Sequence, residues 1–232
     1  MKSLSETKRD TRETKDSLDN PQPAIRLRIT FAKTEAMRYT SHLDLHRTWE
    51  RTVRRAGLPM AYSQGYNPRP RIQIAAALPL GFTSGHELVD VWFQEPVEIA
   101  AAREALDSAS PPGIHIIEIK ETDLRSPALQ TQVRAAEYTA IILEPVPDLN
   151  ERIDRIQTAD SLPRQRRGKN YDLRPLIEEI RRLEDNPEGP QTIQLRLMAQ
   201  EGGTGRPEEV LLEMGISPSL ARVERTQILF KE

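Results

Sequence analysis

The sequence predicts an α+β protein in which one order of elements, strand-helix-strand-strand-helix-strand, occurs twice along the chain. Alternating apolar and polar residues, the pattern of a strand with one buried face, are found in both halves. Segments of helical periodicity separate these strands in the same relative positions in each half. The length of 232 residues allows two small domains or one large one.

The first half starts with a predicted half-buried strand at 25–32, in which apolar residues alternate with polar ones such as Arg26 and Arg28. A helix follows over 42–56, because Ser41 has the capping position and the apolar residues after it have helical spacing. The remaining elements of this half are expected to be strands at 71–78 and 87–94, a helix at 98–109 and a strand from 114 to 119.

The second half repeats this order. Its predicted elements are a strand at 137–144, a helix at 149–159, a strand at 191–199, a helix at 207–214 and a strand at 222–230. The segment 172–185 is ambiguous, because its apolar residues have helical spacing while the turn-rich residues 185–190 indicate a hairpin. We favour a strand there, because a strand completes the second unit, and a helix remains the alternative.

This double pattern is that of two tandem ferredoxin-like domains. We expect a disordered tail over 1–22, where charged residues outnumber apolar ones and no apolar period is present. The N-terminal domain would then span 23–122 and the C-terminal domain 134–232, with a linker at 123–133.

The composition excludes several classes of chemistry. The chain has no cysteine, which rules out disulfides, a thiolate nucleophile and cysteine-bound zinc or iron–sulfur clusters. No apolar stretch is long enough to cross a bilayer, and the first residues lack the apolar core of a signal peptide. We therefore expect a cytoplasmic protein with no membrane partner, no cofactor and no metal.

A first basic cluster combines the helix at 42–56 with the loop that follows it. The formal net charge of the whole chain is −2, yet the segment 38–73 holds seven arginines against Asp44 and Glu50. Guanidinium groups beside flat rings suit phosphates and unstacked bases. The alternatives are a solvated helix face and a protein interface. The candidate nucleic-acid-binding residues in this cluster are Arg47, Arg51, Arg54, Arg55, Tyr62, Tyr66, Asn67, Arg69 and Arg71.

A second basic cluster follows the predicted helix of the second half. It reads as the tip of a flexible hairpin, which either contacts phosphate or is ordinary surface. Its candidate residues are Arg164, Arg166, Arg167, Lys169 and, close by, Arg174.

Other features carry weaker signals for a site. His42 and His46 have metal-ligand spacing beside acidic residues, but no third ligand is evident, so no metal site is expected. Tyr39, Ser41, His42 and Asp44 could form an acid–base group, although a turn-to-helix junction often gathers such residues. The segment 202–205 could cradle a phosphate before a helix, but a plain flexible loop is the favoured interpretation.

The residues 38–45 (Arg-Tyr-Thr-Ser-His-Leu-Asp-Leu), the segment 50–59 and Tyr62-Ser63-Gln64-Gly65-Tyr66-Asn67-Pro68-Arg69-Pro70 resemble the radical SAM-linked protein family. This is a bacterial domain family of unassigned function. Its members stand beside, or are fused to, a radical SAM protein with a cobalamin-type domain. Further resemblances at 78–81, 172–177 and 206–211 extend the match from about residue 25 to the end. Arg69 departs from the family pattern, in which a second basic or aromatic residue occurs in this loop.

The resemblance implies a radical SAM partner, and the absence of cysteine makes this chain similar to the stand-alone accessory half. We therefore expect a module that presents RNA, or another phosphate-rich substrate, to that enzyme. Paired domains of this type recur in RNA-processing proteins, which is an analogy of fold only. The alternatives are a metal-independent RNA-processing or RNA-modifying enzyme with His42 or Tyr39 as general base, and a purely structural partner of the radical SAM protein.

Overall fold

The structure, a computed structural model, describes residues 22–166, 168–183, 189–200 and 202–231. All but the last residue of the predicted tail at 1–22 lies outside these ranges. Within them, helices and strands are mixed along the chain, and most strand pairs are antiparallel. The α+β class is confirmed.

The N-terminal half contains all six predicted elements. They are β1 (Ile25–Lys33), α1 (His42–Arg55), β2 (Ile72–Ile74), β3 (Thr83–Phe93), α2 (Ile99–Ala109) and β4 (Ile114–Thr122), with a short helical turn η1 (Glu35–Met37) after β1. The strands pair antiparallel in the order β4-β1-β3-β2. Residues 75–82, which connect β2 to β3, leave this sheet and reach toward the second half.

The C-terminal half repeats the arrangement. Its elements are β5 (Val133–Ile142), α4 (Leu149–Thr158), β8 (Ile177–Leu183), β9 (Thr192–Gln200), α5 (Pro207–Glu213) and β11 (Ala221–Phe230). The strands pair antiparallel in the order β11-β5-β9-β8. Short elements are added at α3 (Leu129–Gln132), β6 (Pro163–Arg166), β7 (Lys169–Asp172), η2 (Arg174–Leu176), β10 (Gly203–Thr204) and η3 (Pro218–Leu220).

The ambiguous segment 172–185 contains the strand β8, so the favoured strand is confirmed. Its helical spacing has a local cause. The pairing of β8 with β9 shifts register between Ile177 and Glu179, which places the buried Ile177 and Ile180 three positions apart. Such a bulge adds one residue to a strand and changes its period of two to three at that point.

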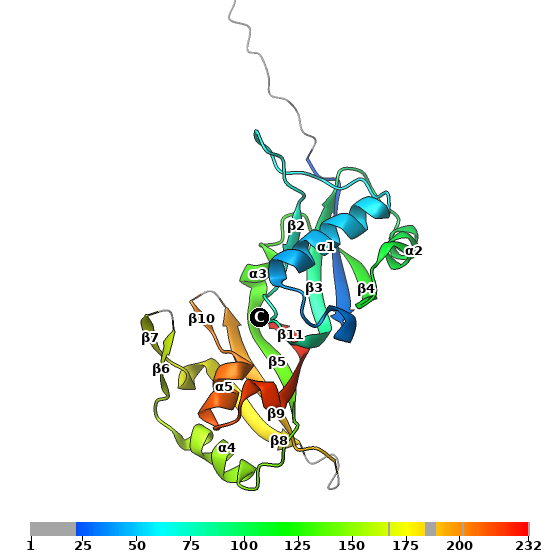
Figure 1. Cartoon of the computed structure of the whole chain (residues 1–232). Helices are drawn as coiled ribbons and strands as arrows, with labels where there is room; N and C mark the ends of the chain where they lie inside the picture. Colours follow the sequence, from blue (N-terminus) through cyan, green and yellow to red (C-terminus); the bar gives the residue numbers. More distant parts are fainter. Residues whose placement is uncertain (1–21, 167, 184–188, 201, 232) are drawn as a thin grey trace, which may run out of the picture.

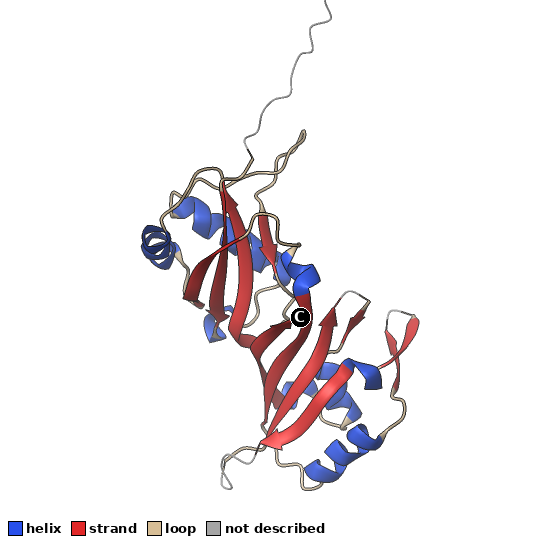
Figure 2. Cartoon of the chain, turned by 180° about the vertical axis from the view of Figure 1, so that it is seen from behind, coloured by secondary structure: helices blue, strands red, loops and turns tan. Residues whose placement is uncertain are grey.

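The two halves join through one nine-stranded sheet. β11 pairs with the start of β3 in parallel, at Glu224–Thr83 and Arg225–Ser84. This edge of β3 is open because β2 has three residues and pairs only farther along, at 89–91. In Figure 1, α1 and α5 lie in front of the strands, and Figure 2 shows the strands from the opposite side. The order of strands within each half is therefore established, whereas two separate ferredoxin-like domains remain a prediction.

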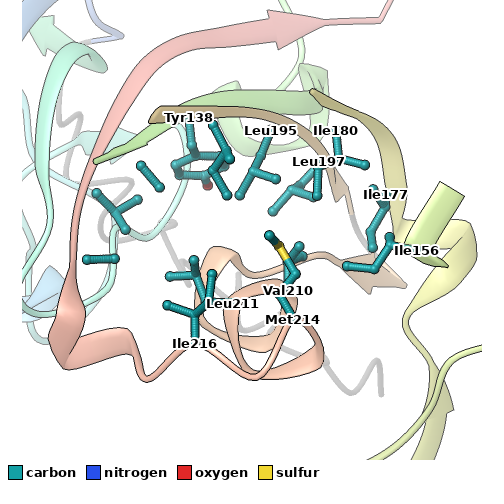
Figure 3. Packing of buried hydrophobic residues seen from close by; sticks show 14 of the residues in the cluster. Tyr138, Ile156, Ile177, Ile180, Leu195, Leu197, Val210, Leu211, Met214 and Ile216 are labelled. Carbon is teal, nitrogen blue, oxygen red and sulfur yellow. The ribbon is translucent and has the colours of Figure 1, made fainter. Parts of the chain in front are cut away.

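Each half has its own apolar core on the helix side of the sheet. In the N-terminal half, Trp49 of α1 packs edge-on against Phe31 of β1, with ring centroids 4.8 Å apart. In the C-terminal half, Figure 3 shows Tyr138, Leu195 and Leu197 of the sheet facing the residues of α5. Leu78 and Phe82 come from the N-terminal half but belong to this second core, so the connection between β2 and β3 fastens the halves together.

The second face of the N-terminal sheet is also covered, which the alternating pattern of β1 did not indicate. Arg26 and Arg28 are buried there. Arg26 donates hydrogen bonds to the carbonyl oxygens of Ser126 (2.7 Å) and Pro127 (3.1 Å), and Leu129 is fully buried. The segment predicted as a linker at 123–133 thus packs on the sheet. The prediction that β1 is half-buried was wrong, because this segment covers the face that alternation assigns to solvent.

Candidate functional site

The helix α1 presents the first basic cluster on the face opposite its core residues. The side-chain oxygen of Ser41 caps the helix by accepting from the backbone N–H of Asp44 (3.2 Å), and Leu45, Trp49 and Val53 are buried. Burial of this stripe turns the opposite face to solvent. The predicted arginines Arg47, Arg51, Arg54 and Arg55 are all exposed.

Part of this charge is compensated within the helix. Arg47 forms an ion pair with Asp44 (3.2 Å), and Arg54 forms one with Glu50 (2.8 Å). Arg54 also forms a side-chain hydrogen bond with Tyr62, which is the first cause of the raised pKa of this guanidinium. No described residue forms an ion pair with Arg51 or Arg55. These two arginines are therefore the helix cations most free to meet a ligand.

The loop after α1 folds back on itself as an irregular hairpin. Tyr62 and Pro70 form an isolated bridge, and the backbone N–H of Ser63 donates to the carbonyl oxygen of Arg69 (2.7 Å). At its tip, the side chain of Tyr66 is 98% exposed, and Asn67 is exposed beside it. A ring in this position contributes nothing to a core and is open for stacking.

Two predicted loop residues have structural contacts instead. The guanidinium of Arg71 lies over the ring of Trp92, 5.3 Å from its centroid. Tyr62 is half-buried and packs against the N-terminal core. Of the five predicted residues in this loop, the exposed ones are Tyr66, Asn67 and Arg69.

The second basic cluster forms the hairpin of β6 and β7. Arg164 is committed to α5, through an ion pair with Glu213 (2.5 Å) and a hydrogen bond to the carbonyl oxygen of Glu209 (3.3 Å). Arg174 donates to the carbonyl oxygens of Ile177 (3.0 Å) and Gln157 (3.1 Å). Both guanidinium groups therefore attach the hairpin to the neighbouring helices and strands of the C-terminal half. Arg167 lies outside the described residues.

The two remaining cations of the hairpin, Arg166 and Lys169, line a pocket of about 650 Å³ together with Tyr171, Asp172 and the segment 202–206. The hairpin thus presents two cations to one hollow of the surface. The sequence predicted that both residues lie at a flexible hairpin tip. It did not indicate that the segment 202–206 lies opposite them across a pocket.

Asp172 fixes the base of this hairpin. Its Oδ1 accepts hydrogen bonds from the backbone N–H groups of Leu162 (2.7 Å) and Arg174 (2.9 Å). These two donors, first that of Leu162 and then that of Arg174, lower the pKa of the Asp172 carboxyl from its ordinary value of 3.8. A carboxylate that accepts backbone N–H bonds is stabilised in its charged form.

We expect acid to loosen this hairpin. Because the folded pKa is depressed, the stabilisation is fully present above about pH 3.8 and is lost as the pH falls through the lower folded value. Asp172→Asn keeps an acceptor oxygen without a charge, so it should reduce the loss of unfolding free energy on acidification. Urea unfolding at several pH values measures this. As a control, Asp172→Ala removes the acceptor and should destabilise the protein at every pH. Equal acid sensitivity of the wild type and Asp172→Asn would contradict the stabilising role of the Asp172 carboxylate.

The two basic clusters lie in different halves of the molecule. α1 and its loop belong to the N-terminal half, and the β6–β7 hairpin belongs to the other half (Figure 1). The pocket beside the hairpin is lined by Arg166 and Lys169 and the one beside the loop by Tyr62 and Arg71, and neither has a described lining residue from the other cluster. The structure therefore does not assemble them into one site.

The glycine-rich segment 202–205 belongs to the hairpin of β9 and β10 rather than to a plain loop. Gly203 and Thr204 form β10, which pairs with the end of β9, and Gly202 turns the chain with φ of 94°. A Cβ atom on Gly205 would lie 2.8 Å from the carbonyl oxygen of Leu176. The glycines are therefore explained by the turn and by close packing.

A further pocket of about 530 Å³ lies where the two halves meet. Its described walls are residues 75–79, residues 130–131 of α3, Tyr138, residues 199–200 and 204–207, and Arg225. It shares Thr204 and Arg206 with the pocket beside the hairpin. The sequence did not single out Arg206, because its position between Gly205 and Pro207 read only as the start of a helix.

The residues considered for acid–base or metal chemistry have other contacts. Ser41 and Asp44 hydrogen bond to each other (2.7 Å) within the helix cap. Nδ1 of His42 is buried and meets no hydrogen-bond partner among the described residues, and burial is the first cause that lowers the pKa of His42. No group of three or more His, Asp or Glu residues that could hold a metal is found in the described ranges. None of the described helices is long and apolar enough to cross a membrane.

These features define an α+β protein of two similar halves, with an exposed basic helix and a projecting loop in the first half and a basic pocket beside the β6–β7 hairpin of the second. The chain belongs to a family of uncharacterized proteins conserved in bacteria (DUF2344), whose model matches residues 26–207. The matched range includes most residues on which the resemblance to the radical SAM-linked family depends. An association with a radical SAM protein stays a prediction.

Other comparisons add little. No curated protein matches the sequence. A chain in the crystal structure of a Cbf5-Nop10-Gar1 complex is similar over 89% of this chain, with 13% sequence identity and a TM-score of 0.45. The similarity covers 50% of that chain. A similarity at this level supports no functional argument.

Proposed function

We infer that this protein is an RNA-binding accessory module, and that α1 and the loop from Tyr62 to Arg71 form the binding surface. The observation that carries this proposal is Tyr66, whose ring is 98% exposed at the tip of a projecting loop. An exposed aromatic ring gains little in water but stacks on an unpaired base of any identity. Arg69 in the same loop supplies a cation for the phosphate beside that base.

The helix adds to the electrostatic part of this surface. Arg51 and Arg55 lack ion-pair partners among the described residues, and the interaction of Arg54 with Tyr62 attaches the loop to the helix. Arg51 and Arg55 would contact phosphates, which supply most of the affinity in RNA and DNA binding. The role of Arg47 and Arg54 is weaker, because each must leave a carboxylate to reach a phosphate.

We expect the double variant Arg51→Glu/Arg55→Glu to weaken binding of a single-stranded oligoribonucleotide. The slope of log affinity against log salt should fall by about 0.7 for each phosphate that the variant no longer neutralises. Tyr66→Ala should cost about 1–3 kcal/mol of binding free energy with the slope unchanged, because stacking involves no counterion release. Fluorescence anisotropy of a labelled oligoribonucleotide at several salt concentrations measures both effects.

The matched control is Arg125→Glu/Arg155→Glu, which makes the same change in net charge at exposed arginines outside the proposed surface. If the control weakens binding as much as Arg51→Glu/Arg55→Glu, the surface is wrongly assigned. Absence of affinity for RNA at low salt would reject the proposal itself.

The partner in this proposal is a radical SAM protein with a cobalamin-type domain, and it rests on the sequence resemblance. The second candidate function, a structural partner of that protein, is favoured by a different observation. Tyr39, Leu43 and Leu80 are large apolar residues that are more than half exposed. A Cβ atom on Gly81 would lie 3.9 Å from the ring of Tyr39, so the start of α1 and the β2–β3 connection adjoin there. Complex formation without RNA affinity would favour this function.

A further inference from the structure

The pocket between the halves and the pocket beside the β6–β7 hairpin share a wall. Thr204 and Arg206 line both the pocket between the halves and the pocket beside the β6–β7 hairpin. Their volumes, about 530 Å³ and about 650 Å³, are each in the range of small-molecule sites. The chain therefore has two adjoining hollows at the same place, and their linings differ in chemistry.

The pocket beside the hairpin is positively charged. Among the described residues, its charged lining consists of the cations Arg166, Lys169 and Arg206 and one carboxylate, Asp172. Asp172 already accepts two backbone N–H groups, so its charge is partly satisfied. No described residue forms an ion pair or a side-chain hydrogen bond with any of the three cations. Their neighbours Arg164 and Arg174, in contrast, donate from Nη atoms to carboxylate or carbonyl oxygens of the protein.

Arg206 carries the strongest local indication of a ligand. Its Nε atom is buried and has no hydrogen-bond partner among the described residues, which is also true of Arg164. Arg164, however, is paired with Glu213 through Nη2, whereas Arg206 has no ion pair among the described residues. A buried donor without a partner is costly, and each such group in a native structure calls for an explanation. An anion in the hairpin pocket would supply an acceptor to the same guanidinium, whose planar fork matches phosphate oxygens.

Apart from Arg206, which it shares with the hairpin pocket, the described lining of the pocket between the halves carries no unpaired charge. Residues 75–79 supply small apolar side chains, and Gln130 and Gln200 supply amides. The guanidinium of Arg225 also lines it, but this charge is paired with Glu87. Such a lining suits the neutral part of a ligand, with a few hydrogen bonds from the amides.

We propose that these two adjoining pockets together bind a phosphate ester of about the size of a nucleoside monophosphate. Its phosphate lies against Arg166, Lys169 and Arg206, and its uncharged part lies in the pocket between the halves. The site is separate from the RNA surface on α1, so the two proposals stand or fall independently.

Isothermal titration calorimetry of the full chain with AMP, GMP, CMP and UMP tests this site, with inorganic phosphate and adenosine as partial ligands. We expect at least one nucleotide to bind more tightly than either partial ligand. Arg206→Met and Arg166→Gln/Lys169→Gln should each weaken nucleotide binding by about tenfold or more for every cation removed. Gln130→Trp, which narrows the uncharged pocket at an exposed position, should weaken nucleotide binding and leave phosphate binding unchanged.

The control Arg51→Glu/Arg55→Glu should leave nucleotide binding intact while it weakens RNA binding. Wild-type protein that binds none of the four nucleotides at millimolar concentration would overturn the site. The same conclusion would follow if Arg166→Gln/Lys169→Gln bound them as wild type does. Equal affinity for phosphate and nucleotide would overturn the role of the uncharged pocket.

Discussion

Replacing Asp90 by asparagine is expected to lower the free energy of unfolding by about 3–5 kcal/mol, the usual range when one partner of a buried ion pair is removed. The fully buried carboxylate of Asp90 serves two arginines of β1. It accepts from both Nε (2.9 Å) and an Nη of Arg26, and from Nε (2.8 Å) and Nη2 (2.9 Å) of Arg28. Without its charge, two guanidinium groups would remain buried with no counterion among the described residues.

The aromatic rings around these arginines do not replace the carboxylate. The guanidinium of Arg26 lies 4.5 Å from the ring centroid of Trp92, and that of Arg28 lies 5.1 Å from the ring centroid of Phe230. A cation–π contact is worth about 0.5–2 kcal/mol, which is less than the penalty of an unpaired buried charge. The net effect of Asp90→Asn should therefore stay large.

Urea unfolding followed by circular dichroism measures this effect. Asp107→Asn is the matched control, because Asp107 pairs with Arg103 (2.6 Å) on the surface, where such a pair contributes about 0–1 kcal/mol. A destabilisation by Asp90→Asn as small as that by Asp107→Asn would contradict the argument. If Asp90→Asn does not fold, we expect the triple variant Asp90→Leu/Arg26→Met/Arg28→Met to fold, because it removes all three charges of this buried cluster.

Glu87→Gln is the second substitution from which we expect a large effect, again about 3–5 kcal/mol. Glu87 and Arg225 are both completely buried, and Glu87 accepts from Nε (2.7 Å) and Nη2 (2.5 Å) of Arg225. Burial is the largest influence on Arg225 and disfavours its cation, yet the charge of Glu87, the interaction with Tyr138 and the hydrogen bonds to both side chains together outweigh it, and the pKa of Arg225 is raised. Lys33 is buried close by, and burial is the first cause that lowers its pKa. Removal of the Glu87 charge would thus leave two cations uncompensated.

This pair also connects the two halves. Glu87 is in β3, Arg225 is in β11, and Arg225 donates further to the carbonyl oxygens of Ala76 (3.1 Å) and Ala77 (3.2 Å). Glu137→Gln is the control, because Glu137 pairs with Arg196 within the C-terminal half at a partly exposed position. We expect the double variant Glu87→Leu/Arg225→Met to recover much of the stability in urea unfolding. Equal destabilisation by Glu87→Gln and Glu137→Gln would contradict this role of the pair.

The order of elements could be predicted because its signals are local. The capped helix α1 with its stripe of Leu45, Trp49 and Val53 was recognised within one residue at its end. The strand β8 was favoured only by the repeat of the order, since its bulge gave it helical spacing. A bulge depends on the partner strand, and no pattern within the segment itself reveals it.

The candidate site could be predicted only in part, for the same reason. Exposure of Arg51, Arg55 and Tyr66 follows from the helical period and from a polar loop. The separate roles of Arg164 and Arg166 do not, because Arg164 is held by the carboxylate of Glu213 and the carbonyl of Glu209, both distant in the sequence. Arg206 entered the site only when the chain brought it beside the hairpin.

Local periodicity and turn residues thus determine the class of the fold and the order of elements that occurs in both halves, and the sequence itself gives the positions of the charged and aromatic residues. The tertiary structure decided how the halves join through β3 and β11, which arginines are buried, and where a pocket forms. These features depend on contacts such as Arg225 to Glu87, 138 residues apart. The free energy of a charged side chain depends more on its burial and its partners than on its residue type. An arginine therefore stabilises the junction at one position and remains free for a ligand at another.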